Sequence, residues 1–408
     1  HACMLVLCVV LLALCIGPTA FRAVAHATTL DSHAREAAVG SDTIFVSVAS
    51  YRDAHCPDTL RSLWAQASNP QNIFVGVVDQ RRAGETPCVK AAAIGHTDRV
   101  AELSRWLENN VRVTTSKAED AMGPAVARYW AAQLRRRERF YLQIDSHTSF
   151  VSGWDVTVVA QLRRLEVERW PKVLLSYHPP MADQLEAEIR RKQQRADRAV
   201  ALQRSFIAQK IWAPPPSVDP PEKPWGLRAL CDADFHPDWG VPVIFSRETR
   251  RVLERDCNTA DPAAEPGFLQ PFTAAGFVFA RAEVLEEVPF APGLQYVFHG
   301  EEIYFTVRAF AKGWRSFRPC ETVASHIEGR AGEPHVWTDV EGARIASKRD
   351  AAYAQLQRAL RLPSRPGGDA PTPGPDSDAV ALPHAELEDY WRFAHVDLAT
   401  WQVNSSAW

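Results

Sequence analysis

The sequence predicts an α/β fold with a parallel sheet, and the pattern of its first half indicates this. Residues 43–51 form an apolar, β-branched and aromatic run that is typical of a buried parallel strand. A helical pattern follows from Asp58, a good N-cap, to Ala67, and residues 72–79 form a second strand. Strand, helix and strand in this order make a βαβ unit, whose two strands are parallel.

The rest of the chain alternates between strand-like and helical patterns. Further strands are expected at 112–115, 140–145, 172–177 and 272–279, and helices at 124–136, 153–165, 281–288 and 303–312. Residues 183–212 are helical by propensity, and 213–224 form a proline-rich loop.

These patterns divide the chain into five expected segments. They are an apolar segment (1–21), a stem (22–42), a globular domain (43–360), a disordered Pro/Gly-rich linker (361–385) and a C-terminal docking tail (386–408).

The N-terminal segment is long enough to interact with a membrane. Residues 2–20 are nearly all apolar, and a run of this length can cross a hydrocarbon core about 30 Å thick. Two interpretations are open: a retained signal-anchor, or a signal peptide cleaved near Gly17–Ala20. We favour the anchor because the apolar run is long.

Charge and cysteine content exclude several functional classes. The formal net charge of −3, with no basic run longer than residues 135–137, argues against nucleic acid as the main partner. The cysteines beyond the apolar run contain no CxxC pair, so no zinc knuckle or thioredoxin-like site is indicated. In a lumenal compartment, Cys56 could pair with Cys88 and Cys231 with Cys257, whereas free thiols are expected in a reducing one.

The strongest candidate for a metal site follows the expected strand 140–145. Asp145 and His147 lie at the carboxyl edge of the sheet, where open α/β folds bind ligands. Residues two apart in an extended segment point to the same side, so both can face one ion. A carboxylate and an imidazole suit Mn²⁺ or a similar divalent ion. The alternative is a strand-end aspartate that caps the next loop beside an incidental histidine.

Two further groups of residues each have more than one interpretation. Glu301 and Glu302 begin an expected helix, where they complement the helix dipole or act on a sugar or an acceptor. His326 could supply a third metal ligand, although a lone histidine is more often a surface or core residue. Arg52 is placed to meet phosphate or uracil with Asp53 as its partner, or the two form a local ion pair.

The sequence contains no Gly-x-Gly-x-x-Gly, Walker, Gly-x-Ser-x-Gly or His-Glu-x-x-His motif. This argues against dehydrogenases, P-loop enzymes, serine hydrolases and zincins.

Ordered blocks of sequence lie at residues 44–53, 56–60, 69–76, 128–129, 141–147 with 150 and 153–155, 274–277, 287–292, 298–302 and 313–314. Together these blocks resemble the polypeptide α-N-acetylglucosaminyltransferases of glycosyltransferase family sixty. This family includes enzymes that modify hydroxyproline and relatives proposed to start mucin-type chains in trypanosomatids. The match at His326 is looser, because Ile327 follows where the family tends to have an aromatic residue.

The resemblance implies a GT-A type fold, a UDP-sugar donor, a divalent cation and retention of anomeric configuration. It implies Mn²⁺ or Mg²⁺ bound by Asp145, His147 and His326, with Glu301 or Glu302 facing the sugar or acceptor. The donor contacts that it implies are Ser50, Arg52, Asp53, Arg128, Asp145 and Gly276.

The leading hypothesis is therefore a retaining transferase that moves GlcNAc from UDP-GlcNAc to a Thr, Ser or hydroxyproline hydroxyl of a polypeptide. The apolar N-terminus favours a type II Golgi or other secretory-pathway membrane protein with a lumenal catalytic domain, and the competing location is the cytoplasm. Three further functions remain open: transfer of a different UDP-sugar such as galactose, transfer to a glycan acceptor, and glycan binding by a catalytically inactive relative.

Overall fold

The computed structural model describes residues 42–94, 99–187, 228–248, 267–327, 332–340, 343–363 and 382–408, together with 189, 190 and 194. All elements below belong to the unit that begins at Ile44. The predicted N-terminal segment, the stem and most of the expected linker lie outside the described residues. Among the described helices, none combines the length and apolar character that a membrane span requires.

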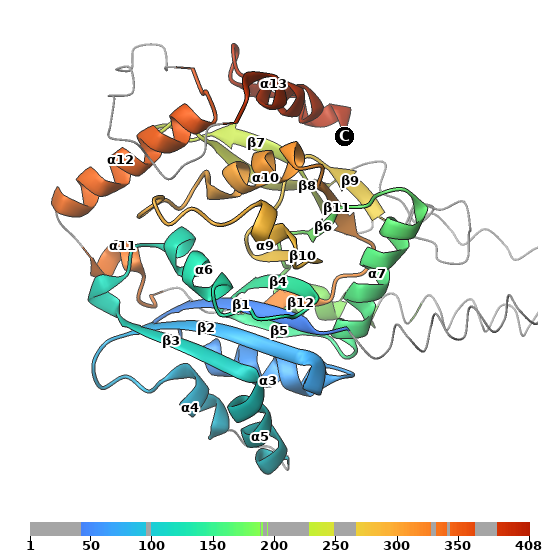
Figure 1. The fold of residues 1–408 in the computed structure, drawn as a ribbon, viewed down its shortest axis with the longest axis vertical. Coiled ribbons are helices and arrows are strands. Elements are labelled where there is room, and N and C mark those ends of the chain that lie inside the picture. Colours follow the sequence, from blue (N-terminus) through green and yellow to red (C-terminus); the bar gives the residue numbers. More distant parts are fainter. Residues whose placement is uncertain are drawn as a thin grey trace, which may run out of the picture. The chain divides into compact units, whose positions relative to one another are not determined.

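An eight-stranded mixed sheet forms the centre of the fold (Figure 1). Its order is β3 (Val111–Lys117), β2 (Ile73–Arg81), β1 (Ile44–Tyr51), β4 (Phe140–Asp145), β10 (Phe277–Arg281), β6 (Val173–Ser176), β11 (Arg315–Pro319) and β9 (Gly267–Gln270). The first four strands are parallel, β10 runs antiparallel to both of its neighbours, and β9 runs antiparallel to β11. The predicted α/β class is confirmed, with a helix-flanked sheet of the kind that a GT-A type fold requires.

The two faces of the sheet pack against different helices, because alternate residues of a strand point to opposite sides. On one face Val46 and its even-numbered neighbours pack with α3 (Cys56–Gln66), α5 (Val100–Asn110) and α7 (Trp154–Glu168). On the other, Phe45 packs with α10 (Glu301–Ala311), and Ala49 with α6 (Pro124–Ala132). Figure 1 shows α3 and α6 on opposite sides of the sheet.

Shorter elements complete the described unit. They are α4 (Cys88–Ala93), β5 (Thr148–Phe150), β7 (Arg228–Phe235), β8 (Pro242–Glu248), α9 (Val284–Glu287), β12 (Ala324–His326), α11 (Val336–Asp339), α12 (Ala343–Ala359), α13 (His384–Phe393), β13 (Val396–Asp397) and β14 (Gln402–Val403). Single 3-10 turns lie at Pro70–Asn72, Ala118–Asp120 and Ser405–Ala407. The β5–β12 pair and the β7–β8 hairpin form separate two-stranded sheets.

The C-terminal segment packs on α10. The Phe310 ring contacts Tyr390 of α13 edge-on at 5.3 Å, and the Tyr390 hydroxyl donates to the Pro271 carbonyl at 3.1 Å. Leu387 and Trp391 are buried in the same apolar cluster, which α12 and the β7–β8 hairpin also enter. This cluster lies beside the sheet and forms a second core.

The strand predicted at 272–279 is wrong in its first half. The structure places Ala274–Gly276 in a turn before β10. Side chains provide the hydrogen-bond partners of the backbone here. The Ala275 amide donates to Glu302 Oε1 at 2.7 Å, and the Ala275 carbonyl accepts from the Gln143 side chain at 2.7 Å. Because these bonds replace strand pairing, the turn brings Gly276 close to the end of β4.

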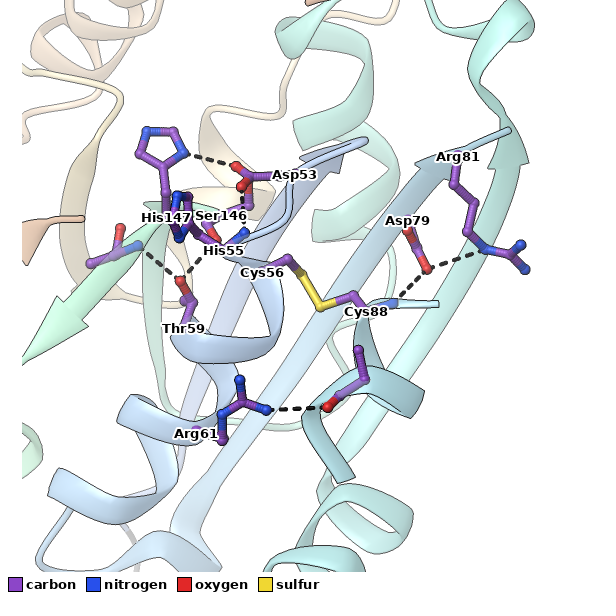
Figure 2. The surroundings of a disulfide bond; sticks show 12 residues. Asp53, His55, Cys56, Thr59, Arg61, Asp79, Arg81, Cys88, Ser146 and His147 are labelled. Carbon is purple, nitrogen blue, oxygen red and sulfur yellow. Dashed lines mark hydrogen bonds and ion pairs between the residues drawn. A yellow bond between two sulfur atoms is a disulfide. The ribbon is translucent and has the colours of Figure 1, made fainter. Parts of the chain in front are cut away.

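Two predictions about cysteines have different outcomes. Cys56 at the start of α3 and Cys88 at the start of α4 form a disulfide (Figure 2). The pairing of Cys231 with Cys257 is wrong, because Cys231 is a free, buried thiol in β7. Cys320 is disulfide-bonded as well. The spacing of cysteines in a sequence does not determine which of them lie close enough in space to form a disulfide.

Replacing both Cys56 and Cys88 by serine is expected to lower the free energy of unfolding by about 3 kcal/mol. The physical reason is the loop of 32 residues that the disulfide closes, whose freedom in the unfolded chain the crosslink removes. Equilibrium unfolding without reductant measures the change. Cys231→Ala, which deletes a thiol but no crosslink, is the control and should cost less. Equal stability of the double variant and the wild type would contradict the expectation.

Candidate functional site

Three side chains that could hold a metal ion meet at the carboxyl edge of the sheet. Asp145 ends β4, His147 follows two residues later, and His326 ends β12. One ligand atom from each lies within 4.8 Å of the others. They line a cavity of about 820 Å³, which is a size typical of small-molecule sites. The structure thus brings together the three residues that the sequence analysis gave as candidate metal ligands.

Backbone pairing brings His326 to this edge from late in the chain. In the antiparallel β5–β12 pair, His326 lies opposite Thr148. The Ile327 amide donates to the His147 carbonyl at 2.7 Å, and the His326 amide donates to the Pro180 carbonyl at 2.8 Å. The two imidazole rings consequently lie with their centroids 5.1 Å apart.

A buried carboxylate orients His147. Asp53, in the loop after β1, accepts the Ser146 hydroxyl at 2.6 Å and lies 2.9 Å from His147 Nδ1 (Figure 2). When Nδ1 carries the proton for this bond, the lone pair is on Nε2, which can then bind a metal. Thr59 of α3 fixes the same turn, since its hydroxyl donates to the Ser146 carbonyl at 2.8 Å and accepts the Thr148 amide at 2.8 Å.

The space between the three side chains fits a cation. A Cβ at position 276 would lie 3.2 Å from Asp145 Oδ2 and 3.4 Å from His326 Nε2, so a side chain here would stand in close contact with both groups. His326 Nε2 is buried without a hydrogen-bond partner among the described residues, 3.3 Å from Asp145 Oδ2. One carboxylate and two imidazoles form a donor set that suits Mn²⁺ and similar divalent ions.

The neighbours of Asp145 keep its carboxyl ionised. Burial alone would raise its pKa, but His326 and Arg128 outweigh burial and hold the pKa of Asp145 well below its usual range. Asp145 is therefore a carboxylate at neutral pH, the form that binds metal ions.

Arg128 of α6 connects Asp145 to Glu301. Its guanidinium contacts Glu301 Oε1 through Nη1 and Asp145 Oδ1 through Nη2, the latter at 3.2 Å. Burial would lower the pKa of Arg128, but the surrounding carboxylates raise it above its usual value. Burial raises the pKa of Glu301, and Arg128 opposes this shift. The direct contact between the two groups favours the ionised form of both.

Glu302 has a different environment from Glu301. Burial is the largest cause that raises the pKa of Glu302 to about 7, and the charge of Glu301 adds to it, while the Ala275 amide opposes it. The two acids begin α10 after Gly300, which has a left-handed φ of 96°. Both acids therefore do more than complement the helix dipole. Glu301 pairs with Arg128, and Glu302 accepts a hydrogen bond from the Ala275 amide in the turn before β10.

Three of the predicted donor contacts do not line the cavity. Ser50 is buried in β1, and Asp53 holds His147 and Ser146. The predicted Arg52–Asp53 ion pair is wrong: the Arg52 guanidinium pairs at 2.5 Å with both Glu85 and Asp339. Arg52 has a left-handed φ of 46°, which is uncommon for a residue other than glycine. Direct donor contact by these residues stays a prediction.

Arg128, Asp145 and Gly276 do line the cavity, together with residues that sequence reasoning missed. Trp239 stacks on Tyr353 at 4.0 Å, and the exposed rings of Phe298 and Trp337 lie 6.0 Å apart. These aromatic residues come from four separate segments of the chain. The high tryptophan content of the sequence indicated that aromatic rings could line a binding site, but it did not identify which rings do so.

A family model described as Glycosyltransferase (GlcNAc) matches residues 43–103 and 94–399. A search of curated proteins gives no match. Among solved structures, the chain is similar to GalNAc-T7 with UDP, GalNAc and Mn²⁺, at 13% identity and a TM-score of 0.43, covering 88% of this chain and 56% of that one. It thus spans little more than half of that protein.

Two other solved structures are similar at the same level. One is S. aureus TarS 1-349 in complex with UDP-GlcNAc, with 13% identity, a TM-score of 0.37, and coverage of 78% of this chain and 72% of that one. The other is the mannosyltransferase PcManGT from Pyrobaculum calidifontis in complex with GDP-Man and Mn²⁺, with 14% identity, a TM-score of 0.40, and coverage of 90% and 73%.

Asp53→Asn is expected to weaken Mn²⁺ binding by about 10- to 100-fold, the usual effect of losing a carboxylate that orients a metal-binding histidine. The amide keeps the shape but loses the charge that favours the Nδ1 proton on His147. Calorimetric titration of the metal-free protein measures the affinity. Asp79→Asn is the matched control, because Asp79 is also buried near a strand end but contacts the Cys88 amide. Equal losses in both variants would contradict the assignment.

Glu302→Gln is expected to remove a pH dependence of stability in the metal-free protein. The folded chain holds the Glu302 proton more tightly than the unfolded chain, so its stabilising effect is complete below about pH 4.5 and is lost as pH rises through about 7. The stability of Glu302→Gln relative to wild type should therefore increase over this interval by roughly 1–3 kcal/mol. Unfolding curves at several pH values test this, with the surface variant Glu286→Gln as control. A constant difference would contradict it.

Proposed function

Because the chain belongs to the Glycosyltransferase (GlcNAc) family, we propose that it transfers GlcNAc from UDP-GlcNAc to a hydroxyl group of a polypeptide. The acceptor in this proposal is Thr, Ser or hydroxyproline, the reaction retains anomeric configuration, and it depends on Mn²⁺ or Mg²⁺. The family supports the transfer of a sugar. The resemblance of the sequence blocks to polypeptide α-GlcNAc-transferases supports the donor, the acceptor and the stereochemistry.

One observation carries the proposal: Asp145, His147 and His326 converge in a large cavity at the carboxyl edge of the sheet. These three residues would hold the ion. When bound, a divalent cation supplies positive charge that stabilises a departing diphosphate. Gly276 leaves the room for this chemistry, since any side chain there would approach Asp145 and His326.

The chain's own acids have separate roles in the proposal. Glu302, whose pKa is about 7, is largely protonated below neutral pH and can donate a hydrogen bond to a sugar hydroxyl. Retention can proceed by attack of the acceptor hydroxyl on the face that the diphosphate leaves. The departing phosphate oxygen then takes the proton of the acceptor hydroxyl, and no protein nucleophile is needed.

Exposed aromatic residues in the cavity lining support a polypeptide acceptor. Phe298 and Trp337 line the cavity and expose 55% and 38% of their surfaces. Exposed aromatic rings beside a reaction site provide apolar contacts for a bound chain.

The secretory pathway is the proposed location, with the catalytic domain in the lumen of the Golgi or a related compartment. The Cys56–Cys88 disulfide and the disulfide-bonded Cys320 support an oxidising environment. The apolar residues 2–20 support a type II membrane anchor.

The proposal is tested by the release of UDP from UDP-GlcNAc in the presence of Thr- or hydroxyproline-containing peptides. Chelation with EDTA should abolish activity, and added Mn²⁺ should restore it. Asp145→Ala should lower kcat/KM by at least about 100-fold, because the ion loses its carboxylate ligand. Asp58→Ala, which removes an exposed carboxylate from α3, is the control.

Full activity after chelation, or in Asp145→Ala, would refute the metal role. A panel of nucleotide sugars in the same assay distinguishes GlcNAc transfer from the competing functions. Faster UDP release from a galactose donor would indicate another sugar, and no release from any donor would indicate a glycan-binding protein without activity.

A further inference from the structure

The geometry points to Arg128 and Glu301 as a pair of positioning residues that set the orientation and the charge of the metal ligand Asp145. This inference rests on the proposed metal-dependent function, and it assigns both residues a role other than contact with the donor, the acceptor or the sugar.

Arg128 separates the two oxygens of the Asp145 carboxylate. Oδ1 accepts from the Arg128 guanidinium at 3.2 Å, whereas Oδ2 lies 3.3 Å from His326 Nε2. The planar guanidinium engages Glu301 through its other terminal nitrogen and is therefore held at both ends. The Asp145 side chain cannot rotate without breaking the bond at Oδ1, so Oδ2 is the oxygen presented to the metal site.

The role of Glu301 follows from charge. The charges of Asp145 and Arg128 alone would cancel, so this pair would attract a divalent cation only weakly. Glu301 contacts the other terminal nitrogen of Arg128, and it gives the group of three side chains a net negative charge. Burial strengthens these interactions, because the side chains of Arg128 and Glu301 are each only 10% exposed.

Both residues sit on elements that fix them rigidly. Arg128 lies in the middle of α6, which packs on β1 and β2 through Ala127 and Ala131. Glu301 is the first residue of α10, after a glycine whose Cβ would approach Leu356 to 2.6 Å. The pair therefore couples two helices on the same face of the sheet to the end of β4.

The test measures Mn²⁺ affinity in the absence of donor, by calorimetry and by the electron paramagnetic resonance signal of bound Mn²⁺. Glu301→Gln keeps the size and hydrogen-bonding capacity of the side chain but leaves the Arg128 charge uncompensated. It should weaken Mn²⁺ binding by about 10-fold. Adding Arg128→Met to Glu301→Gln removes that charge and should recover part of the lost affinity. The remainder should stay lost, because Asp145 Oδ1 no longer has its hydrogen bond.

Two further variants make the comparison specific. Glu301→Asp conserves the charge and should bind Mn²⁺ nearly as well as wild type. Glu138→Gln breaks another buried pair, with Arg112 at 2.5 Å, outside the cavity, and should leave Mn²⁺ binding unchanged. If the Arg128→Met background does not fold, Glu301→Gln and Glu301→Asp still decide the question.

The inference is overturned if Glu301→Gln binds Mn²⁺ like wild type while its KM for UDP-GlcNAc rises, which would show direct contact with the donor. It is also overturned if the double variant binds Mn²⁺ no better than Glu301→Gln, because Glu301 would then act independently of Arg128. A wild-type chain that binds neither Mn²⁺ nor Mg²⁺ would instead refute the metal dependence of the proposed function itself.

Discussion

The pairing of β12 with β5 is the constraint on which the site depends. His326 lies far from Asp145 in sequence, and neither the central sheet nor a helix positions it. Three antiparallel residue pairs, together with backbone bonds to Pro180 and His147, hold it beside the end of β4. Strand pairing fixes the direction of a side chain as well as its position, since a shift by one residue would turn the imidazole to the opposite face.

The charged groups of the site also depend on one another, because the loss of any one would leave a buried charge without its partner and would destabilise the fold. Arg128 is buried, and a buried guanidinium is stable only when acids pair with it. Asp145 and Glu301 provide those acids, and Asp53 pairs in a similar way with His147. Polar groups on β4, α6, α10 and the loop after β1 thus pair with one another around the cavity, and the same bonds give Asp145 and His147 fixed orientations.

Much of the central fold could be predicted from the sequence. The strands at 44–51, 73–81 and 140–145 are long, apolar and β-branched, so their pattern alone indicates a buried parallel sheet. The turn at Ala274–Gly276 could not be predicted this way. Its residues are as apolar as those of a strand, and its backbone groups bond to the side chains of Gln143 and Glu302, which are both distant in sequence.

The candidate site, too, could be predicted only in part. Asp145 and His147 follow a recognisable strand, whereas the partners of Arg52 come from a loop and from a short helix near the end of the globular region.

Gly276 has a consequence for the evolution of such proteins. Its missing side chain, and not a ligand, keeps the gap beside Asp145 and His326 open. A gene copy that exchanged this one residue for alanine would retain every acid, every histidine and the whole fold. The new methyl group would nevertheless displace Asp145 by a few tenths of an ångström, so a descendant could lose metal affinity while all of its signature motifs remained intact.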